Sequence, residues 1–296
     1  MCGIFGYLGP RQASTILLDG LRRLEYRGYD STGIAVKNGG IQIHKKVGKV
    51  GDLEQILPNE IPGTQGIAHT RWATHGGVTD ANAHPHESAQ RKVVIVHNGI
   101  IENTRQLRAS LTVQGVELQS DTDSEALAHI IERELSVDND PANAVRRTLH
   151  QARGTWGLCA LFLEHDVIVC ARNGSPLIIG QGDDEMFVSS DPHALTPYTQ
   201  RVVFLDDGEM ATLTPNSMSL STLKGKNFDA SITVLEDGWC DSELGDYPHF
   251  MLKEIYEQPD ALRHCISGRL DRVRGNGRLG GLKLEPRDLA NIPHVR

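Results

Sequence analysis

Apolar side chains recur along this chain with two different spacings, and together they predict an α+β fold. Residues 12–25 carry an apolar stripe at helical spacing, formed by Ala13, Ile16, Leu17, Leu21 and Leu24. Helical patterns return at 102–114, 123–135 and 141–152. Short apolar runs that indicate strands lie at 1–8, 33–37, 41–45, 66–71 and 93–97, and the glycine-rich junction at 38–40 is a hairpin signal.

The pattern changes in the second half of the chain. From 155 to 222 it predicts mainly strands, near 156–163, 166–171, 177–180, 186–189, 202–206, 209–213 and 217–222. After about residue 223 the chain becomes acidic and poorly periodic, and a helix is expected after Pro248. We therefore expect one domain at 1–223, and over 224–296 a linker and the start of a further domain.

Composition excludes several classes of protein. A formal net charge of −8 disfavours nucleic acid as the main partner, because phosphate binding requires a basic face. No apolar stretch approaches the roughly 20 residues of a membrane helix, so no membrane association is expected. The five cysteines show no paired metal spacing, which indicates a reduced, cytoplasmic protein.

Cys2 is the strongest chemical signal in the sequence. A small residue at position 2 normally allows the initiator methionine to be removed, and Cys2 would then carry its thiol beside its own α-amine. Such an amine has a pKa of about 7.7–8.0 and can accept a proton near neutral pH. It is a known activator of a nucleophile. A cysteine at this position is usually without function, but the apolar, glycine-flanked run at 1–8 indicates a buried first strand that begins at Cys2.

Asn98 and Gly99 follow the predicted strand at 93–97 and have two interpretations. A side-chain amide beside an unhindered backbone N–H could form an oxyanion hole. The same dipeptide is the usual signal of a type I′ turn, and by itself it favours the turn.

Two further segments carry groups that could bind a substrate. In the segment 69–77 (HTRWATHGG), Arg71 could pair with a carboxylate, Trp72 could cover a pocket and the two glycines could hinge a loop. A surface ion pair of Arg71 is the structural alternative. In the segment 121–125 (DTDSE), Asp121 or Asp123 could cap the following helix or hold an ammonium group, and capping is the simpler interpretation.

Histidines cluster between residues 69 and 97, which raises the alternative of a metallohydrolase. A catalytic zinc site needs three ligands and an open position. No helical His-Glu-x-x-His motif occurs, and Pro85 separates His84 from His86. We therefore expect neither a metal nor another cofactor.

Taken together, these segments resemble the glutaminase domain of the class II, or N-terminal-nucleophile, glutamine amidotransferases. The residues that match the whole class are 1–4 (MCGI), 27–28 (RG), 97–99 (HNG) and the aspartate before the third helix. The segments 26–31 (YRGYDS), 70–76 (TRWATHG) and 253–259 (KEIYEQP) resemble the amino-sugar synthase branch, which aminates fructose 6-phosphate. The resemblance covers roughly residues 1–265 and implies a four-layer αββα sandwich.

The resemblance also implies a role for each matching residue. Cys2 would attack the side-chain amide of glutamine, while Asn98 and Gly99 hold the oxyanion. The substrate's α-carboxylate and α-ammonium groups would be bound by Arg71 and Asp123, respectively. The remaining matches are Thr74 and His75 in a closing loop, Arg27 as a brace for the first strand, and Trp72 as the gate of an ammonia channel.

The sugar-phosphate isomerase half of that branch is absent from this sequence. Fructose 6-phosphate would then be reached only through the missing half, which would also carry the main contact of a homodimer. Two alternatives remain open: a glutaminase that serves another acceptor, such as phosphoribosyl pyrophosphate or aspartate, and a module that binds glutamine without cleaving it.

Overall fold

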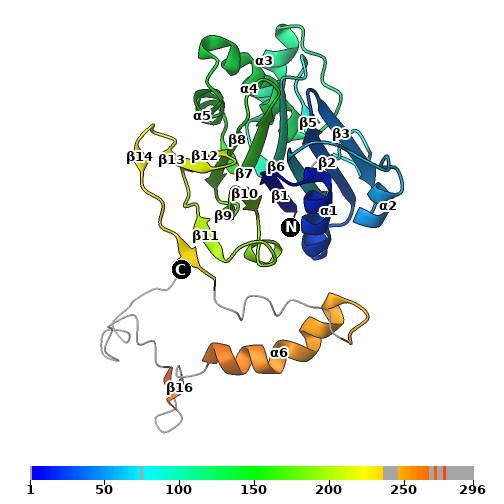
Figure 1. Cartoon of the computed structure of the whole chain (residues 1–296), viewed down its shortest axis with the longest axis vertical. Coiled ribbons are helices and arrows are strands. Elements are labelled where there is room, and N and C mark those ends of the chain that lie inside the picture. Colours follow the sequence, from blue (N-terminus) through cyan, green and yellow to red (C-terminus); the bar gives the residue numbers. More distant parts are fainter. Residues whose placement is uncertain (1, 74–75, 236–245, 267–269, 272–275, 278–296) are drawn as a thin grey trace. The chain divides into compact units, whose positions relative to one another are not determined.

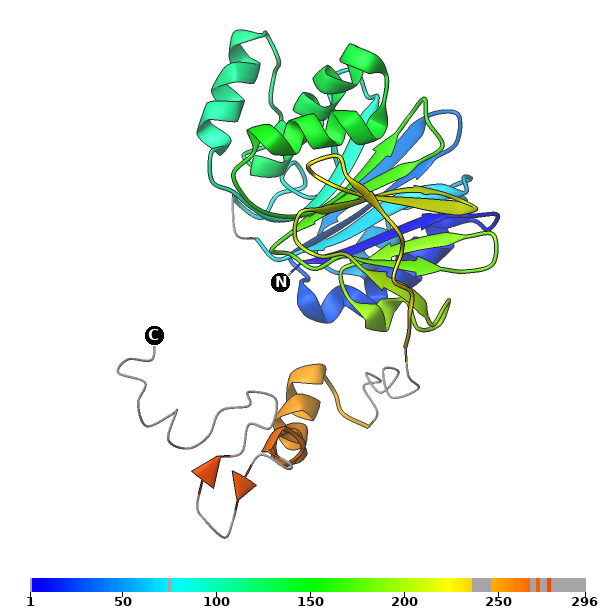
Figure 2. The same ribbon diagram turned by 90° about the vertical axis from the view of Figure 1, so that its left-hand side faces the viewer.

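Two antiparallel sheets stack face to face in this protein, and each contains residues from both halves of the sequence (Figures 1 and 2). The computed structural model describes residues 2–73, 76–235, 246–266, 270–271 and 276–277. Contacts between residues divide the chain into two units, Met1–Asp241 and Ser242–Arg296. Both sheets belong to the first unit.

The first sheet has the strand order β15-β11-β9-β10-β1-β4-β2-β3. Its strands in chain order are β1 (Gly3–Leu8), β2 (Ser31–Lys37), β3 (Ile41–Val47), β4 (Gln65–Arg71), β9 (Ile178–Gln181), β10 (Met186–Ser189), β11 (Arg201–Phe204) and β15 (Thr233–Val234). Gly3 of β1 pairs with Thr70 of β4, so the start of the chain lies beside the end of β4.

The second sheet has the order β14-β13-β12-β8-β7-β6-β5. Its strands are β5 (His86–Glu87), β6 (Val93–Ile101), β7 (Gly154–Phe162), β8 (Ile168–Asn173), β12 (Glu209–Thr214), β13 (Ser217–Thr222) and β14 (Asn227–Phe228). The expected strands of 155–222 are confirmed, and they are shared between the two sheets.

Three separate apolar clusters show that the domain has four layers. Alternating side chains of each central strand enter different clusters, as the period of a strand requires. In β6, Val94 and Val96 enter the cluster between the sheets, whereas Val93 and Ile95 face the helices. In β1, Phe5 and Tyr7 belong to a third cluster, on the other outer face. The αββα arrangement implied by the resemblance is confirmed.

Helices cover both outer faces (Figure 2). The first sheet is covered by α1 (Ala13–Leu24), with α2 (Val50–Glu54) and the short 3-10 turns η1 (Glu25–Arg27) and η2 (Pro192–Ala194) nearby. The second is covered by α3 (Thr104–Val113), α4 (Asp123–Asp138) and α5 (Pro141–Gln151). The four predicted helices in this unit are confirmed, while the short elements α2 and β5 were not expected.

The strands after residue 223 extend both sheets. Val234 of β15 pairs with Arg201 of β11, and Phe228 of β14 pairs with Leu220 of β13. The boundary at 223 stays a prediction, since the first unit runs to Asp241.

In the second unit the described residues form α6 (Phe250–Ile266) and the paired strands β16 (Leu270–Asp271) and β17 (Asn276–Gly277). The helix expected after Pro248 is confirmed. No helix among the described residues of either unit combines the length and apolar character needed to span a bilayer.

A candidate active site at the N-terminus

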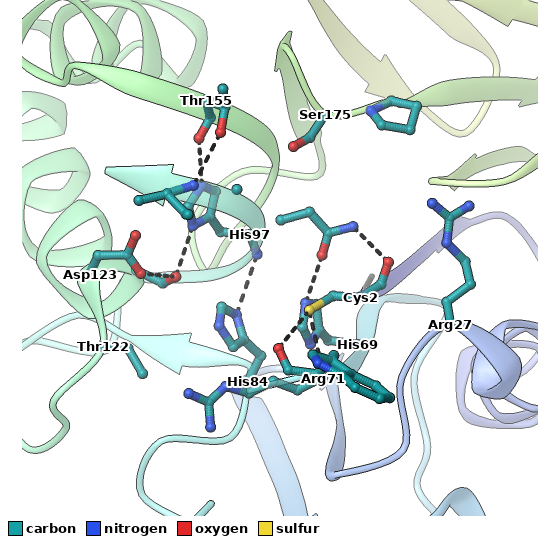
Figure 3. Close-up of a pocket in the computed structure, with 16 residues that line it drawn as sticks. Cys2, Arg27, His69, Arg71, His84, His97, Thr122, Asp123, Thr155 and Ser175 are labelled. Carbon is teal, nitrogen blue, oxygen red and sulfur yellow. Dashed lines mark hydrogen bonds between the residues drawn. The ribbon is translucent and has the colours of Figure 1, made fainter. Parts of the chain in front are cut away.

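A pocket of about 310 Å³ lies where the start of β1, the end of β4, the later part of β6 and the start of α4 meet. Figure 3 shows the side chains that line it. They include seven of the nine residues predicted from the sequence: Cys2, Arg27, Arg71, Trp72, Asn98, Gly99 and Asp123. The other two, Thr74 and His75, lie outside the described residues.

The thiol of Cys2 is held against the backbone at the end of β4. Its Sγ accepts a hydrogen bond from the Trp72 N–H at 3.2 Å. Burial raises the pKa of this thiol, while the Trp72 N–H and the positive charge of Arg71 oppose the rise. The resting group is therefore a neutral thiol that needs a base before it can attack.

Gly28 allows the backbone around Trp72 to approach this closely. A Cβ added at Gly28 would lie 2.9 Å from the Trp72 nitrogen and 2.9 Å from the Arg71 carbonyl carbon. Any larger residue would displace the peptide that donates to Cys2.

Asn98 and Gly99 lie inside β6, where they pair with Gly157 and Trp156 of β7. The type I′ turn favoured by the dipeptide is therefore wrong, because the strand continues through it. Gly99 has φ +131°, and a Cβ there would overlap the Thr155 carbonyl oxygen. Only glycine fits this conformation without strain.

The Asn98 side chain bridges two groups. Its Nδ2 donates to the Cys2 carbonyl at 3.1 Å, and its Oδ1 lies 2.9 Å from His69 Nε2. An amide NH₂ has two hydrogens, so one remains to donate to a ligand. The dashed lines in Figure 3 mark both contacts.

Arg71 is the last residue of β4 and is 4% exposed, so the surface ion pair considered from the sequence is wrong. Its Nη1 donates to the Gly77 carbonyl at 3.1 Å. Burial lowers the pKa of Arg71, and the negative charges of Asp30 and Asp123 oppose that effect. The guanidinium carries five N–H donors in a planar fork, a geometry that matches the two oxygens of a carboxylate.

Asp123 is the first residue of α4 rather than its cap. The N-cap is Thr122, whose side chain accepts from the Glu125 N–H, so the expectation that Asp121 or Asp123 caps the helix is wrong. The Asp123 carboxylate accepts from the Ile101 N–H at 2.8 Å and is 6% exposed. A buried carboxylate at the pocket wall can hold an ammonium group by charge and hydrogen bonds together.

Arg27 and Trp72 form the rim. Arg27 Nη1 donates to Asp191 Oδ2 at 2.7 Å and to the Ser190 carbonyl at 3.3 Å, which ties η1 to the end of β10. Trp72 is 44% exposed and packs edge-on against Tyr29, with ring centroids 5.5 Å apart. Trp72 can therefore cover the mouth of the pocket.

Four of the five clustered histidines are buried, and three of them, His69, His84 and His97, belong to the lining of the pocket. His75 lies outside the described residues. The rings of His69 and His84 stack with centroids 4.2 Å apart, and His86 packs edge-on against His84 at 4.5 Å. Burial lowers the pKa of His69 to about 3, and burial also lowers the pKa values of His84, His86 and His97. Across the part of the chain that the structure describes, no group of three or more His, Cys, Asp or Glu side chains could hold a metal ion.

Sequence reasoning missed His69, Ser124 and Thr155 as parts of this site. The only signal was the proximity of His69 to Arg71 and of Ser124 to Asp123 in the sequence. Thr155 had none, because its place beside Gly99 depends on the pairing of β6 with β7.

Comparisons with known proteins agree with this geometry. Residues 69–197 match the family model of the glutamine amidotransferase domain. The chain is 46% identical over 291 residues to the glutamine–fructose-6-phosphate aminotransferase (isomerizing) of Chlorobaculum tepidum, covering 95% of this chain and 47% of that protein. With the Thermus thermophilus protein of the same name it shares 44% over 297 residues, covering 100% and 48%.

The fold also matches a solved structure, the glutamine phosphoribosylpyrophosphate amidotransferase of B. subtilis, with a TM-score of 0.65 and 26% identity. That match covers 75% of this chain and 49% of the other. The chain spans about half the length of the curated relatives it matches. It carries a class II glutamine amidotransferase domain and corresponds, over nearly its whole length, to the N-terminal half of the glutamine–fructose-6-phosphate aminotransferases.

Proposed function

We propose that this chain hydrolyses the side-chain amide of glutamine to glutamate and ammonia. The observation that carries the proposal is the one pocket shared by Cys2, Asn98, Gly99, Arg71 and Asp123, which come from distant parts of the sequence. These groups supply a nucleophile, oxyanion donors, a cation and an anion. The nucleophile matches the side-chain amide carbon of glutamine and the oxyanion donors match its amide oxygen. The cation matches the α-carboxylate and the anion matches the α-ammonium group.

In this proposal Cys2 is the nucleophile once Met1 has been removed. The freed α-amine takes the thiol proton as sulfur adds to the amide carbon, and then gives it to the departing nitrogen, which leaves as ammonia. Water next adds to the γ-glutamyl thioester and releases glutamate, restoring the thiol. The raised pKa of Cys2 makes this nearby base necessary.

Asn98 and Gly99 stabilise the negative oxygen of each tetrahedral intermediate. The donors are the second Nδ2 hydrogen of Asn98 and the backbone N–H of Gly99. Loss of one such donor typically costs roughly 3–4 kcal/mol of transition-state stabilisation. The conformation of Gly99, fixed by the carbonyl of Thr155, supports this assignment.

The two ends of the substrate's amino acid group are bound by opposite charges. Arg71 meets the α-carboxylate and Asp123 meets the α-ammonium. Thr74 and His75 belong to the loop that closes over the substrate, Arg27 braces β1, and Trp72 gates the exit of ammonia. The half-exposed position of Trp72 above the pocket supports the last of these roles.

The ammonia acceptor we propose is fructose 6-phosphate, bound by a sugar-phosphate isomerase half that follows residues 224–296 in a longer protein. The identity of about 45% to two aminotransferases that bear this substrate in their names supports it over phosphoribosyl pyrophosphate or aspartate. We further propose a homodimer held by that second half and a cytoplasmic location.

Glutamate release by the purified chain tests this function. We expect turnover only in preparations whose N-terminal residue, determined by mass spectrometry, is Cys2. Cys2→Ala should abolish turnover, whereas Cys265→Ala should retain it, because the exposed Cys265 belongs to the second unit and the groups assigned to the reaction all belong to the first.

Two results would contradict the proposal. Wild-type rates in Cys2→Ala would exclude Cys2 as nucleophile. Glutamine binding without turnover, in a sample whose N-terminus is Cys2, would favour a binding module instead.

A further inference from the structure

His69 is a buried histidine that the proposed reaction does not use. It lies on β4 with no exposed surface, and its Nε2 is 2.9 Å from Asn98 Oδ1. Its other ring nitrogen, Nδ1, is buried without a hydrogen-bond partner in the described part of the chain. Among the described residues, the hydrogen bond that its ring makes is therefore with the side chain assigned to the oxyanion.

The direction of the Asn98 amide decides whether that side chain can serve the reaction. With Oδ1 facing His69, the Nδ2 hydrogens face the Cys2 carbonyl and the pocket. In the reversed orientation, Oδ1 would face both the Cys2 carbonyl and the developing oxyanion. That arrangement is repulsive and removes a donor whose loss typically slows such reactions by roughly 100- to 1000-fold.

A neutral His69 that donates from Nε2 enforces the productive orientation. Its environment keeps it neutral, since it is fully buried and stacks face to face on His84, with Arg71 nearby. A neutral imidazole has one donor nitrogen and one acceptor nitrogen. Because Asn98 Nδ2 faces the Cys2 carbonyl, Asn98 Oδ1 faces His69, and the donor nitrogen of His69 must be Nε2. The His69 ring and the Asn98 amide therefore fix each other's orientation.

The histidine stack also reaches the opposite side of the pocket. His86 packs against His84, and His86 Nε2 lies 3.0 Å from Thr122 Oγ1. Thr122 is the N-cap of α4 and directly precedes Asp123. The same row of rings therefore connects the oxyanion side of the site with the helix end that carries the proposed ammonium-binding group.

We infer that His69 is a positioning residue, which holds the Asn98 amide with its N–H groups toward the reacting carbonyl. The inference rests on the proposed glutaminase function. It assigns His69 an effect on the rate of the chemical step and none on the binding of glutamine, since His69 contacts Asn98 rather than Arg71 or Asp123.

A double-mutant cycle for glutamate release tests this role. His69→Phe keeps a flat ring in the stack and removes the donor. We expect kcat to fall by roughly 10- to 100-fold with KM for glutamine unchanged, a change typical of an interaction made in the transition state. In an Asn98→Ala background the same substitution should have almost no further effect, because the group it positions is gone.

His69→Gln is the conservative partner variant, since its side-chain amide can place an N–H near the position of Nε2. We expect it to recover much of the lost kcat. Thermal unfolding of each variant reports on folding. If His69→Phe fails to fold, His69→Asn, whose shorter amide does not reach Asn98, takes its place in the cycle.

Three results would overturn the inference while leaving the function intact: wild-type kcat in His69→Phe, an equal loss in the Asn98→Ala background, or no recovery with His69→Gln. Absence of turnover in the wild-type chain with Cys2 exposed would instead overturn the proposed function and this inference with it.

Discussion

At the scale of single residues, the site depends on contacts that surround Cys2. Seven of the residues that line the pocket were named from the sequence, because the segments that carry them have recognisable chemistry. Their roles stay proposals. Their contacts could not be predicted, since the hydrogen bond from Trp72 N–H to Cys2 depends on the register of β1 against β4. The buried row of histidines illustrates the same limit, because in the sequence it only raised a metal site as an alternative and gave no sign of stacking.

The assignment of Arg71 to the substrate carboxylate predicts a binding defect in Arg71→Lys. Lysine keeps the charge but loses the planar fork of donors that matches a carboxylate. Hydrogen bonds to charged groups contribute roughly 1.5–3 kcal/mol, so kcat/KM for glutamine should fall by about 10- to 100-fold, mainly through KM. Steady-state kinetics of glutamate release measure this.

Arg201→Lys is a matched control for that substitution, because the exposed Arg201 side chain donates to Gln181 and is not among the residues that line the pocket. Its kinetics should equal those of the wild type. An unchanged KM in Arg71→Lys would place the carboxylate elsewhere.

At the scale of elements, the helices and strands with clear periodicity were predicted and the shortest ones were not. The five residues of α2 and the two of β5 are too few to show a period. The pair Asn98-Gly99 shows how context overrides a local signal, because its turn preference gives way to pairing with β7 over nine positions. The capping box Thr122-x-x-Glu125 was present in the sequence and could have identified the start of α4.

The strained backbone of β6 predicts a large defect in Gly99→Ala. Its Cβ would overlap the Thr155 carbonyl at φ +131°, which moves the N–H assigned to the oxyanion. We expect kcat to fall by at least about 100-fold, as for loss of an oxyanion donor. Gly40→Ala is the control, since a Cβ there meets nothing within 4 Å. Near-normal kcat in Gly99→Ala would exclude this N–H from the reaction.

The start of α4 predicts a pH-dependent contribution of Glu125 to stability. Its buried carboxylate accepts from the N–H groups of Gln119 at 2.6 Å and Ser120 at 2.8 Å. Although burial alone would raise the pKa of Glu125, the neighbouring His129 ring, whose Nε2 lies 3.6 Å from Oε1, and the hydrogen bonds from Gln119 and Ser120 lower it from 4.5 to about 2. Because the folded-state pKa lies below the unfolded value, the stabilisation is complete above the unfolded pKa and is lost as pH falls toward about 2.

Urea unfolding of Glu125→Gln measures that contribution. The variant should be less stable than wild type by roughly 2–3 kcal/mol near neutral pH, and the difference should shrink between about pH 5 and about pH 3. Exposed Glu117 loses the same charge in Glu117→Gln and should show no such trend. A difference that does not change with pH would contradict the assigned role.

At the scale of the whole molecule, the pattern of apolar residues predicted an α+β fold, and only the resemblance implied four layers. Alternating strands predict two faces for a sheet but not which sheet a strand joins. The strands between residues 155 and 222 divide between the two sheets, and their crossovers are set by packing among distant residues. The continuation of the first unit beyond residue 223 was equally hard to predict from the sequence, because β14 and β15 have two residues each and show no periodicity.

Two truncated chains test where that unit ends. Leu235 is 3% exposed in the cluster beneath α1, and its N–H donates to the Gln200 carbonyl. A chain that ends at residue 241 should keep the stability of the first unit. A chain that ends at residue 223 loses β15 and Leu235. Its free energy of unfolding should be lower by about 2–5 kcal/mol, the typical effect of removing a buried leucine side chain. Equal stability of the two in urea would support the boundary at 223.

In the proposed reaction the thiol of Cys2 forms a covalent bond with the glutamyl group of glutamine. The most direct test of this step is intact-mass analysis of the chain, with Met1 removed, after rapid mixing with glutamine and acid quenching. We expect a transient γ-glutamyl adduct, which peptide mapping places on Cys2 and which is absent from Cys2→Ala. Glutamate release with the adduct on another residue, or an adduct that persists in Cys2→Ala, would contradict the proposed reaction.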